Sequence, residues 1–166
     1  FIENNIFTNN VNVKPLSISV VYTKVFARNN YFINNIFKGC LINLSNVKYP
    51  DILPEHNAIF FSDNVITQNI SSSGFLTTIA GAIKLDSNNF NNNTSAYILK
   101  NANSPTQQPY LDISNNYWGV NTTDELSEVV YDFFDDANLG ITIFDNVLLS
   151  PPTQSPVLPP AQVKKT

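Results

Sequence analysis

The chain has few residues of the kinds that usually carry metal, redox or proton-transfer chemistry. It contains one cysteine, one histidine, one tryptophan and no methionine, so an intrachain disulfide is excluded. Charged residues make up only 13% of the 166 residues, and the formal net charge is −4. A nucleic-acid-binding protein needs a clustered basic face, whereas the basic residues here are scattered. We therefore expect no nucleic-acid partner.

The chain also lacks an apolar run of membrane-spanning length, so we expect no membrane span. Its 43% hydrophobic content is enough for one domain with a sizeable core. Because residue 1 is Phe1 and methionine is absent, we expect a mature or cut piece whose signal peptide or preceding domain lies outside this sequence.

Asparagine is abundant and its placement is periodic. Low-complexity drift explains runs such as Asn91–Asn93, but it does not explain asparagine at fixed offsets from apolar residues. Five anchor asparagines lie 25, 34, 24 and 28 residues apart, and they are Asn5, Asn30, Asn64, Asn88 and Asn116. Three positions around the anchors are always apolar. Three before lie Ile2, Ala27, Phe61, Leu85 and Ile113, and two after lie Phe7, Phe32, Ile66, Phe90 and Trp118. Five before lie Val25, Ile59, Ile83 and Leu111, since the first repeat is too short to have this position.

These offsets predict a strand followed by a corner. Offsets −5 and −3 lie on one face of a strand, and the residue at +2 points inward again after the bend. We expect the anchor asparagine to occupy the bend, because it tolerates the left-handed conformation, and we expect equivalent amides to stack into ladders. A second strand is expected around residues 40–45, with Cys40, Ile42 and Leu44 pointing inward.

A period of this length predicts a solenoid, because one coil cannot bury its own inner face and must stack on its neighbours. Residues 1–119 are expected to form about five coils. The longest interval contains Lys48–His56, in which two prolines predict an external loop. A leucine-rich repeat is the competing solenoid, but its regular leucine spacing is missing.

Residues 120–150 are expected to cap the last coil. Thr122 and Glu125 are in capping-box register, and a helix is predicted over about 123–135. Its apolar face would consist of Leu126, Val129, Val130, Phe133 and Phe134. A closing strand is predicted over 141–144. Residues 151–166 form a proline-rich tail that we expect to be extended.

With these residues in hand, the chain resembles the right-handed parallel β-helix repeat proteins of the pectate-lyase-like superfamily. The resemblance covers roughly residues 1–150 and is strongest in Ile113–Gly119, followed by a short helix, Asp132–Asp136 and Gly140. It implies an all-β, right-handed parallel β-helix with a C-terminal capping helix. It implies no particular activity, because this fold carries lyases, hydrolases, adhesins and inert spacers.

The enzymes of this superfamily act on acidic or neutral polysaccharides, and such chemistry needs carboxylates gathered on one face. The candidates here are Asp63, Asp86 and Asp112, whose offsets of −1, −2 and −4 do not place them in one column. Arg28 and Lys84 are similarly isolated. We therefore expect no catalytic residue, cofactor or metal site.

The remaining candidate residues have plainer structural explanations. His56 has no nearby partner and is expected on the surface of the loop, and Cys40 is expected to be a buried structural thiol. Asp135–Asp136 lacks the alternating oxygen ligands of a calcium loop. Trp118 and Phe90 occupy inward positions, whereas Tyr31 and Tyr117, directly after their anchors, are expected to face outward.

Five N-glycosylation sequons begin at Asn43, Asn69, Asn92, Asn93 and Asn121. We expect Asn43 to point outward and the other four to lie in bends or loops, with Asn92 and Asn93 not modified together.

The absence of catalytic clusters, the low charge and the sequons favour a non-enzymatic extracellular or cell-surface structural module in a surface or filamentous assembly. The N-terminal end has no predicted cap, so we expect self-association or additional coils there. A carbohydrate-binding or adhesion module that uses Tyr31 and Tyr117 is the first alternative. A degenerate polysaccharide lyase or hydrolase is the second.

Overall fold

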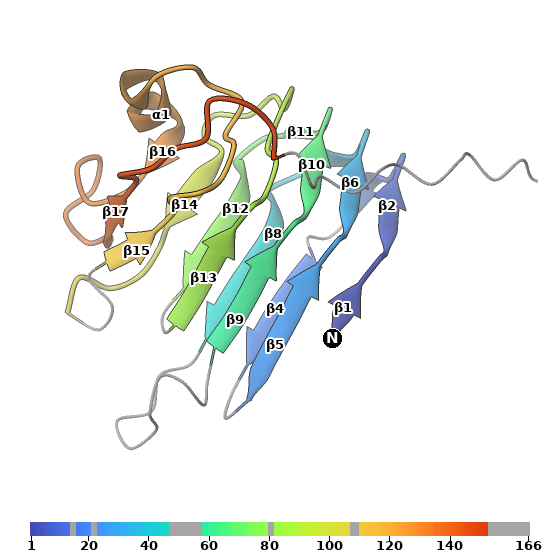
Figure 1. The fold of residues 1–166 in the computed structure, drawn as a ribbon, viewed down its shortest axis with the longest axis horizontal. Helices are drawn as coiled ribbons and strands as arrows, with labels where there is room; N and C mark the ends of the chain where they lie inside the picture. Colours follow the sequence, from blue (N-terminus) through green and yellow to red (C-terminus); the bar gives the residue numbers. More distant parts are fainter. Residues whose placement is uncertain (14–15, 21–22, 47–57, 80–81, 107–109, 153–166) are drawn as a thin grey trace, which may run out of the picture.

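The chain folds into parallel β-strands that stack as several sheets around an apolar interior (Figure 1). The computed structural model describes residues 1–13, 16–20, 23–46, 58–79, 82–106 and 110–152. Within these ranges every strand pair is parallel, and the one helix has seven residues. The arrangement is compatible with a β-helix or another solenoid.

The strands recur in sets of four along the chain. The first set is β1 (Ile2–Glu3), β2 (Ile6–Thr8), β3 (Val11–Val13) and β4 (Leu16–Val20). The second is β5 (Lys24–Arg28), β6 (Tyr31–Ile33), β7 (Ile36–Phe37) and β8 (Cys40–Asn46), and the third is β9 (Ala58–Ser62), β10 (Val65–Thr67), β11 (Ile70–Ser71) and β12 (Gly74–Ile79). The remaining elements are β13 (Ala82–Asp86), β14 (Leu99–Asn101), β15 (Tyr110–Asp112), α1 (Thr123–Val129), β16 (Val130–Tyr131) and β17 (Ile141–Ile143).

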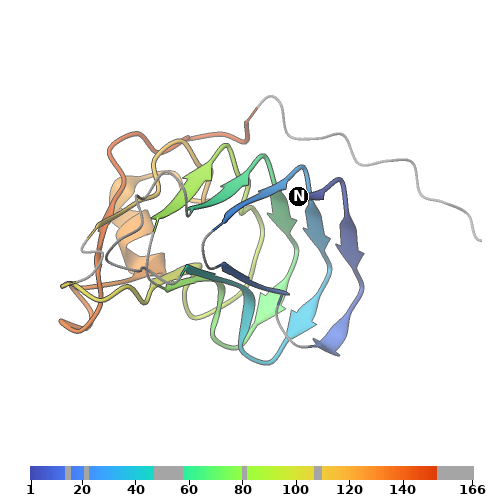
Figure 2. The same cartoon turned by 90° about the horizontal axis from the view of Figure 1, so that it is seen from below.

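Each strand pairs with its counterpart in the next set, so the sets form layers. The four main sheets have the orders β1-β5-β9-β13, β10-β6-β2, β11-β7-β3 and β16-β14-β12-β8-β4, and a separate pair joins β15 to β17. Figure 2 shows the blue N-terminal strands at one end of the stack and α1 at the other. We call the edge formed by β1, β2, β3 and β4 the N-terminal rim, because all four main sheets end there.

The three apolar positions predicted in each repeat do form the interior. They lie in the buried core cluster, except that Ile2, Phe7 and Val25, in the first layers, are half-buried and pack against it. Trp118, Phe61, Ile59 and Ile66 are completely buried. The offsets predicted the core correctly because a strand and its corner present side chains to the interior at fixed intervals.

The corners differ from the prediction by one residue. The left-handed backbone conformation belongs to the residue before each anchor, with φ between 54° and 58° at Asn29, Asp63, Ser87 and Asn115 and 59° at Asn4. The anchors themselves have no positive φ. The first residue of each pair therefore makes the turn, which frees the side chain of the second residue to bond between layers.

Aromatic side chains from successive layers stack on one another. Inside, Phe7 lies 4.7 Å from Phe32 and Phe90 lies 4.4 Å from Trp118, measured between ring centroids. Offset stacking at such distances adds to the free energy of area burial. Strand pairing in register brings equivalent residues of each layer together, and this produces the columns.

The capping helix is shorter than predicted. The Thr122 hydroxyl accepts a hydrogen bond from the Glu125 amide at 3.2 Å, which confirms the expected cap, but α1 ends at Val129 instead of near residue 135. Val130 and Tyr131 extend the five-stranded sheet as β16. Pairing with β14 through Leu99 and Lys100 satisfies their backbone groups, so the helix stops where the sheet begins.

The predicted apolar face of that helix is correspondingly wrong beyond residue 130. Leu126 is its only buried residue, and Val130 is buried as part of β16. Phe133 and Phe134 are exposed, Phe134 by 81%. The predicted loop at residues 48–56, including His56, lies outside the described residues, as does the proline-rich tail beyond residue 152.

Candidate functional site

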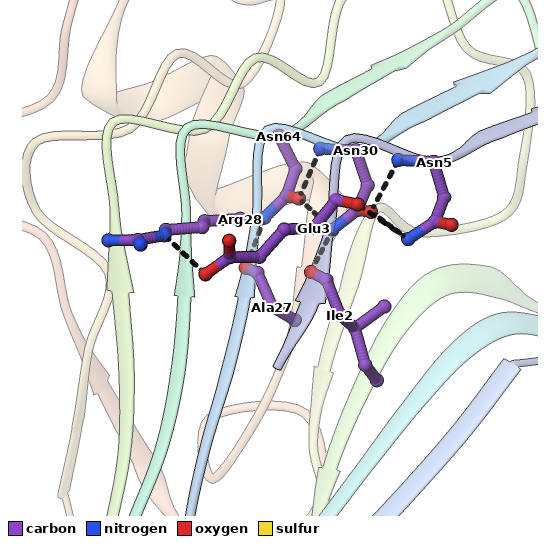
Figure 3. Close-up of polar contacts among 7 residues, drawn as sticks. All are labelled: Ile2, Glu3, Asn5, Ala27, Arg28, Asn30 and Asn64. Carbon is purple, nitrogen blue, oxygen red and sulfur yellow. Dashed lines mark hydrogen bonds and ion pairs between the residues drawn. The ribbon is translucent and has the colours of Figure 1, made fainter.

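The anchor asparagines form a hydrogen-bonded ladder that runs through the stack (Figure 3). In each rung the side-chain oxygen of one asparagine accepts two bonds from the asparagine of the preceding layer. One comes from the backbone amide at 3.0–3.1 Å and one from the side-chain Nδ2 at 2.8–3.0 Å. The ladder is formed by Asn5, Asn30, Asn64, Asn88 and Asn116. The predicted stacking of amides is therefore confirmed.

The four ladder amides after Asn5 also bond to the backbone of the layer before them. Nδ2 of Asn30 donates to the Ile2 carbonyl at 2.8 Å, and Nδ2 of Asn64 donates to the Ala27 carbonyl at 2.9 Å. Both hydrogens of these buried amides are therefore used. The ladder therefore has a direction. Each Oδ1 atom points toward the N-terminal rim, where it accepts hydrogen bonds from the asparagine of the preceding layer.

A second ladder runs parallel to the first, five residues further along each repeat, and sequence reasoning missed it. Its rungs are Asn10, Asn35, Asn69 and Asn93, with Nδ2 to Oδ1 distances of 2.8–3.1 Å. The residues before them, Asn9, Asn34, Gln68 and Asn92, have left-handed backbone conformations. The signal was present in the sequence, because asparagine occurs five residues after each of the five anchors. The last of these, Asn121, lies at the start of the cap and is not a rung.

The two ends of the first ladder differ. At the C-terminal end, Nδ2 of Asn116 donates to the carbonyls of Ile113 and Ser114 in its own turn and of Leu85, so its donors are satisfied. At the N-terminal rim, Oδ1 of Asn5 and Oδ1 of Asn10 accept no hydrogen bond from the described part of the chain. In the second ladder the last rung is Asn93, whose Nδ2 donates to one carbonyl of the described residues, that of Ile66, at 2.7 Å.

The predicted glycosylation sites fall into different environments. Asn69 is 1% exposed and is a ladder rung, so its amide is not available for a glycan. Asn93 is half-buried at the end of the same ladder, with Nδ2 donating to the Ile66 carbonyl at 2.7 Å. Asn43 is half-buried within β8. Asn92 and Asn121 are exposed. Asn69 does lie at a corner, between β10 and β11, but it is buried because it is the ladder residue of that corner and not the turn residue.

Two of the three candidate carboxylates, Asp86 and Asp112, line one groove, although they do not share an offset from their anchors. β13 and β15 are joined at one end, where the Ser87 amide donates to the Asn115 carbonyl at 2.9 Å, but they do not pair along their lengths. Between them lies a groove of about 500 Å³ lined by Ala82, Ile83, Lys84, Leu85, Asp86, Tyr110, Asp112, Ser114 and Asn115. Asp63 does not line it. The offsets did not predict this groove, which lies where β15 pairs with β17 instead of continuing the sheet that ends at β13.

The groove combines an apolar base with polar and aromatic edges. Ile83 and Leu85 are almost buried, Tyr110 is 56% exposed, and Asp112 and Asp86 are exposed. Asp112 accepts a hydrogen bond from the Ser114 amide at 2.9 Å, which fixes its carboxylate. A surface of this kind offers hydrogen-bond acceptors, one ammonium and an aromatic face to a polar ligand.

The other candidate polar residues are engaged locally. Arg28 pairs with Glu3 at 2.7 Å on the surface. Asp136 accepts hydrogen bonds from the backbone and side chain of Asn138, and these bonds hold the pKa of its carboxyl below the ordinary value. Among the described residues, no three histidine, cysteine or acidic side chains gather as metal ligands would.

The aromatic candidates divide between core and surface. Trp118 and Phe90 are buried as predicted, and Tyr117 is half-buried. Tyr31 is not part of the core cluster that contains its neighbour Phe32, yet it is only 4% exposed, so it offers no accessible aromatic surface. The exposed aromatic side chain in the groove is Tyr110, which sequence reasoning did not single out because it lies outside the counted offsets.

Cys40 is half-buried, and the inward position expected for it is taken by Leu41, which is 1% exposed. Burial raises the pKa of the Cys40 thiol, against the opposing effect of hydrogen bonds with Thr77 and the Ile42 backbone. Since only the thiolate is nucleophilic, we expect iodoacetamide at pH 8 to alkylate Cys40 about tenfold more slowly than a free thiol. Mass spectrometry over time measures this rate, and full reactivity in guanidinium is the control. An equal rate in the folded protein would contradict the burial.

No helix in the described part of the chain is long and apolar enough to cross a membrane. Comparison with known proteins finds no matching protein-family model, no matching curated protein and no matching solved structure.

Proposed function

We propose that the chain is a non-enzymatic, extracellular structural module: a right-handed parallel β-helix of about five coils that forms a segment or subunit of a surface or filamentous assembly. The observation that supports this proposal is the pair of asparagine ladders, which join successive parallel layers through buried side-chain hydrogen bonds. Layers of this kind are the repeating units of solenoid proteins, in which each repeat is stabilised by its neighbours. Right-handedness follows from the strand twist, which makes nearly all crossovers between parallel strands of one sheet right-handed.

The assembly role is tested by the size of the native particle. We expect the protein, purified without denaturant, to sediment as a species larger than the 18.5 kDa chain and to be recovered from the cell surface or the medium. Electron microscopy of the same fraction would reveal the filament or surface layer. A native species consisting of the free monomer would contradict the proposal.

The extracellular location predicts glycans at particular sequons. We expect carbohydrate on Asn121 and Asn92, which are exposed, and none on Asn69, whose two amide hydrogens bond to the Phe32 carbonyl and to Asn93 Oδ1. Glycopeptide mapping of native material measures occupancy at each site. Thr123→Ala removes the Asn121 sequon and leaves the capping residue Thr122 in place, so it should lower the intact mass by one glycan. Unmodified Asn121 and Asn92 would contradict the proposed location.

The groove between β13 and β15 supports a second candidate function, the binding of an oligosaccharide. Carboxylates accept hydrogen bonds from sugar hydroxyls, and an exposed tyrosine provides a face for the ring. Titration with neutral and acidic oligosaccharides, followed by NMR, would show shifts at Tyr110 and Asp112. We expect Tyr110→Ala to abolish these shifts and Asp63→Asn, which lies away from the groove, to preserve them.

The same titration separates binding from catalysis. Accumulation of shortened sugar products would identify a lyase or hydrolase and contradict the non-enzymatic proposal. No shift with any oligosaccharide would remove the binding candidate and leave the structural one.

A further inference from the structure

Two side chains on the outer face of the sheet β10-β6-β2 are buried. In β6, Phe32 belongs to the core cluster, so strand alternation directs its neighbours Tyr31 and Ile33 to the outer face. Tyr31 is nevertheless 4% exposed, and Ile33 is 8% exposed. A further part of the molecule must therefore lie over this face of the middle strand.

The neighbouring sheet β11-β7-β3 shows the exposure of an uncovered face. In β7, Ile36 follows its ladder residue directly, as Tyr31 does in β6, and each lies in a middle strand that is paired on both sides. Ile36 is 41% exposed, against 4% for Tyr31. Pairing with two neighbouring strands therefore does not by itself bury a side chain at this position.

The Tyr31 hydroxyl gives a second indication of a cover. It is buried without a hydrogen-bond partner among the described residues, and burial raises the pKa of the phenol above its ordinary value. A buried hydroxyl normally has a partner, so the covering segment should bring free acceptors to it. An extended proline-rich chain has such acceptors, because its carbonyls make no internal hydrogen bonds.

The C-terminal segment approaches this face. Val147 packs against the core, the Leu148 amide donates to the Asn116 carbonyl at 3.1 Å, and Pro152 is half-buried. Figure 1 and Figure 2 both show this red segment running along the stack from the α1 end toward the N-terminal strands. The segment thus lies over a corner of the first ladder and leads toward the layer of Tyr31.

The residues that follow are within reach of Tyr31. Asn116 and Asn30 are three rungs apart in the first ladder, which is about 14 Å at the usual spacing of parallel strands. An extended proline-rich chain advances about 3.1 Å per residue, so a direct path needs about five residues beyond Leu148. Val157 lies further along the chain than this minimum, which leaves slack for the path to follow the surface.

The undescribed segments inside the chain join strands of other sheets. Residues 47–57, the longest of them, connect β8 to β9, and none of them begins or ends at β2, β6 or β10. The residues after Pro152 instead follow a segment that lies over the first ladder. They include the apolar run Pro156–Pro160. Connectivity and composition therefore both favour the tail as the cover.

We propose that residues 153–160 of the same chain lie as an extended strap across the outer face of the sheet β10-β6-β2, where Val157 and Leu158 cover Tyr31 and Ile33. The strap joins several layers from outside, in addition to the ladders that join them from within. Proline restricts the backbone, so the segment loses little conformational entropy on docking, and proline-rich segments commonly dock on aromatic surfaces. The inference does not depend on the proposed assembly role.

Nitration by tetranitromethane tests the cover on the full chain. The reagent attacks the phenolate, and peptide mapping by mass spectrometry gives the rate at each tyrosine. We expect Tyr31 to react at least about tenfold more slowly than Tyr110, which is 56% exposed, because reaction requires the strap to open. Val157→Asp with Leu158→Asp should raise the Tyr31 rate by about tenfold, since docking would bury two unpaired carboxylates.

A matched control and a truncated chain make the result specific. Lys165→Asp with Thr166→Asp adds two carboxylates beyond the strap and should leave the Tyr31 rate unchanged. In a chain that ends at Pro152, Tyr31 should react about as fast as Tyr110, and a synthetic peptide of residues 153–166 should slow the reaction again. Fluorescence of the buried Trp118 reports whether each variant stays folded.

The contrary outcomes are distinct. Fast nitration of Tyr31 in the full chain, or slow nitration in either the folded truncated chain or the Val157→Asp, Leu158→Asp variant, would overturn the proposal. Equal acceleration by the control variant would indicate a general effect of charge and would also overturn it. Protection that is lost on dilution would place the tail of a second copy on this face and contradict a strap within one chain.

Discussion

Replacing Asn64 with alanine is expected to lower the free energy of unfolding by about 4 kcal/mol, because several buried polar groups lose their partners at once, at about 1–3 kcal/mol each. Asn64 is fully buried; Oδ1 accepts from the backbone and side chain of Asn30, and Nδ2 donates to Ala27 and Asn88. Alanine removes all four bonds and leaves the surrounding backbone in place. Urea unfolding followed by tryptophan fluorescence measures the change.

The matched control is Asn121→Ala, which changes an exposed asparagine at the start of the cap. Its expected cost is within about 0.5 kcal/mol, as for most surface substitutions. If Asn64→Ala cost no more than Asn121→Ala, the ladder would be a geometric coincidence of stacked layers instead of a source of stability.

Trp118→Ala is expected to cost about 4 kcal/mol, the size usual for deleting a large aromatic side chain from a core. Trp118 is fully buried, stacks on Phe90 with an angle of 5° between the rings, and donates from Nε1 to the Ile113 carbonyl at 3.3 Å. Its removal opens a cavity beneath the last corner of the stack. Thermal unfolding followed by far-ultraviolet circular dichroism measures the loss without relying on tryptophan fluorescence.

Two comparisons make this result specific. Trp118→Phe retains the aromatic stack and loses the Nε1 bond, so it should cost about 2 kcal/mol. Phe134→Ala removes an 81% exposed ring of the segment predicted to be helical and should cost little. A large loss of stability in Phe134→Ala together with a small loss in Trp118→Ala would support the longer helix predicted from the sequence and contradict the burial of Trp118.

The core was predictable because burial imposes fixed spacing on it. Offsets −5, −3 and +2 identified Ile59, Phe61 and Ile66 correctly from sequence alone. The assignment within each corner was wrong because two adjacent polar residues share it, and asparagine suits both positions. The sequence does contain the distinction: the turn position also holds Asp63 and Ser87, whereas the ladder position is asparagine in all five repeats.

The groove could not be predicted by the same counting. The offsets correctly place Asn116 against Asn88 and Trp118 against Phe90, but they do not show that β15 is unpaired with β13. There the chain leaves the sheet, because β17 returns to pair with β15 in register from Tyr110 to Asp112. The helix boundary was missed for a related reason: pairing of β16 with β14 overrides the helical spacing of the apolar residues.

The central claim is that buried asparagine ladders bind the layers together, and hydrogen exchange of the asparagine side-chain amides tests it most directly. NMR resolves these groups individually, and the exposed amides of Asn92 and Asn121 provide references within the same molecule. We expect the amides of Asn30, Asn64 and Asn88 to exchange at least about a hundredfold more slowly than the references, since exchange requires the layers to open. Exchange at the reference rate would contradict the ladders.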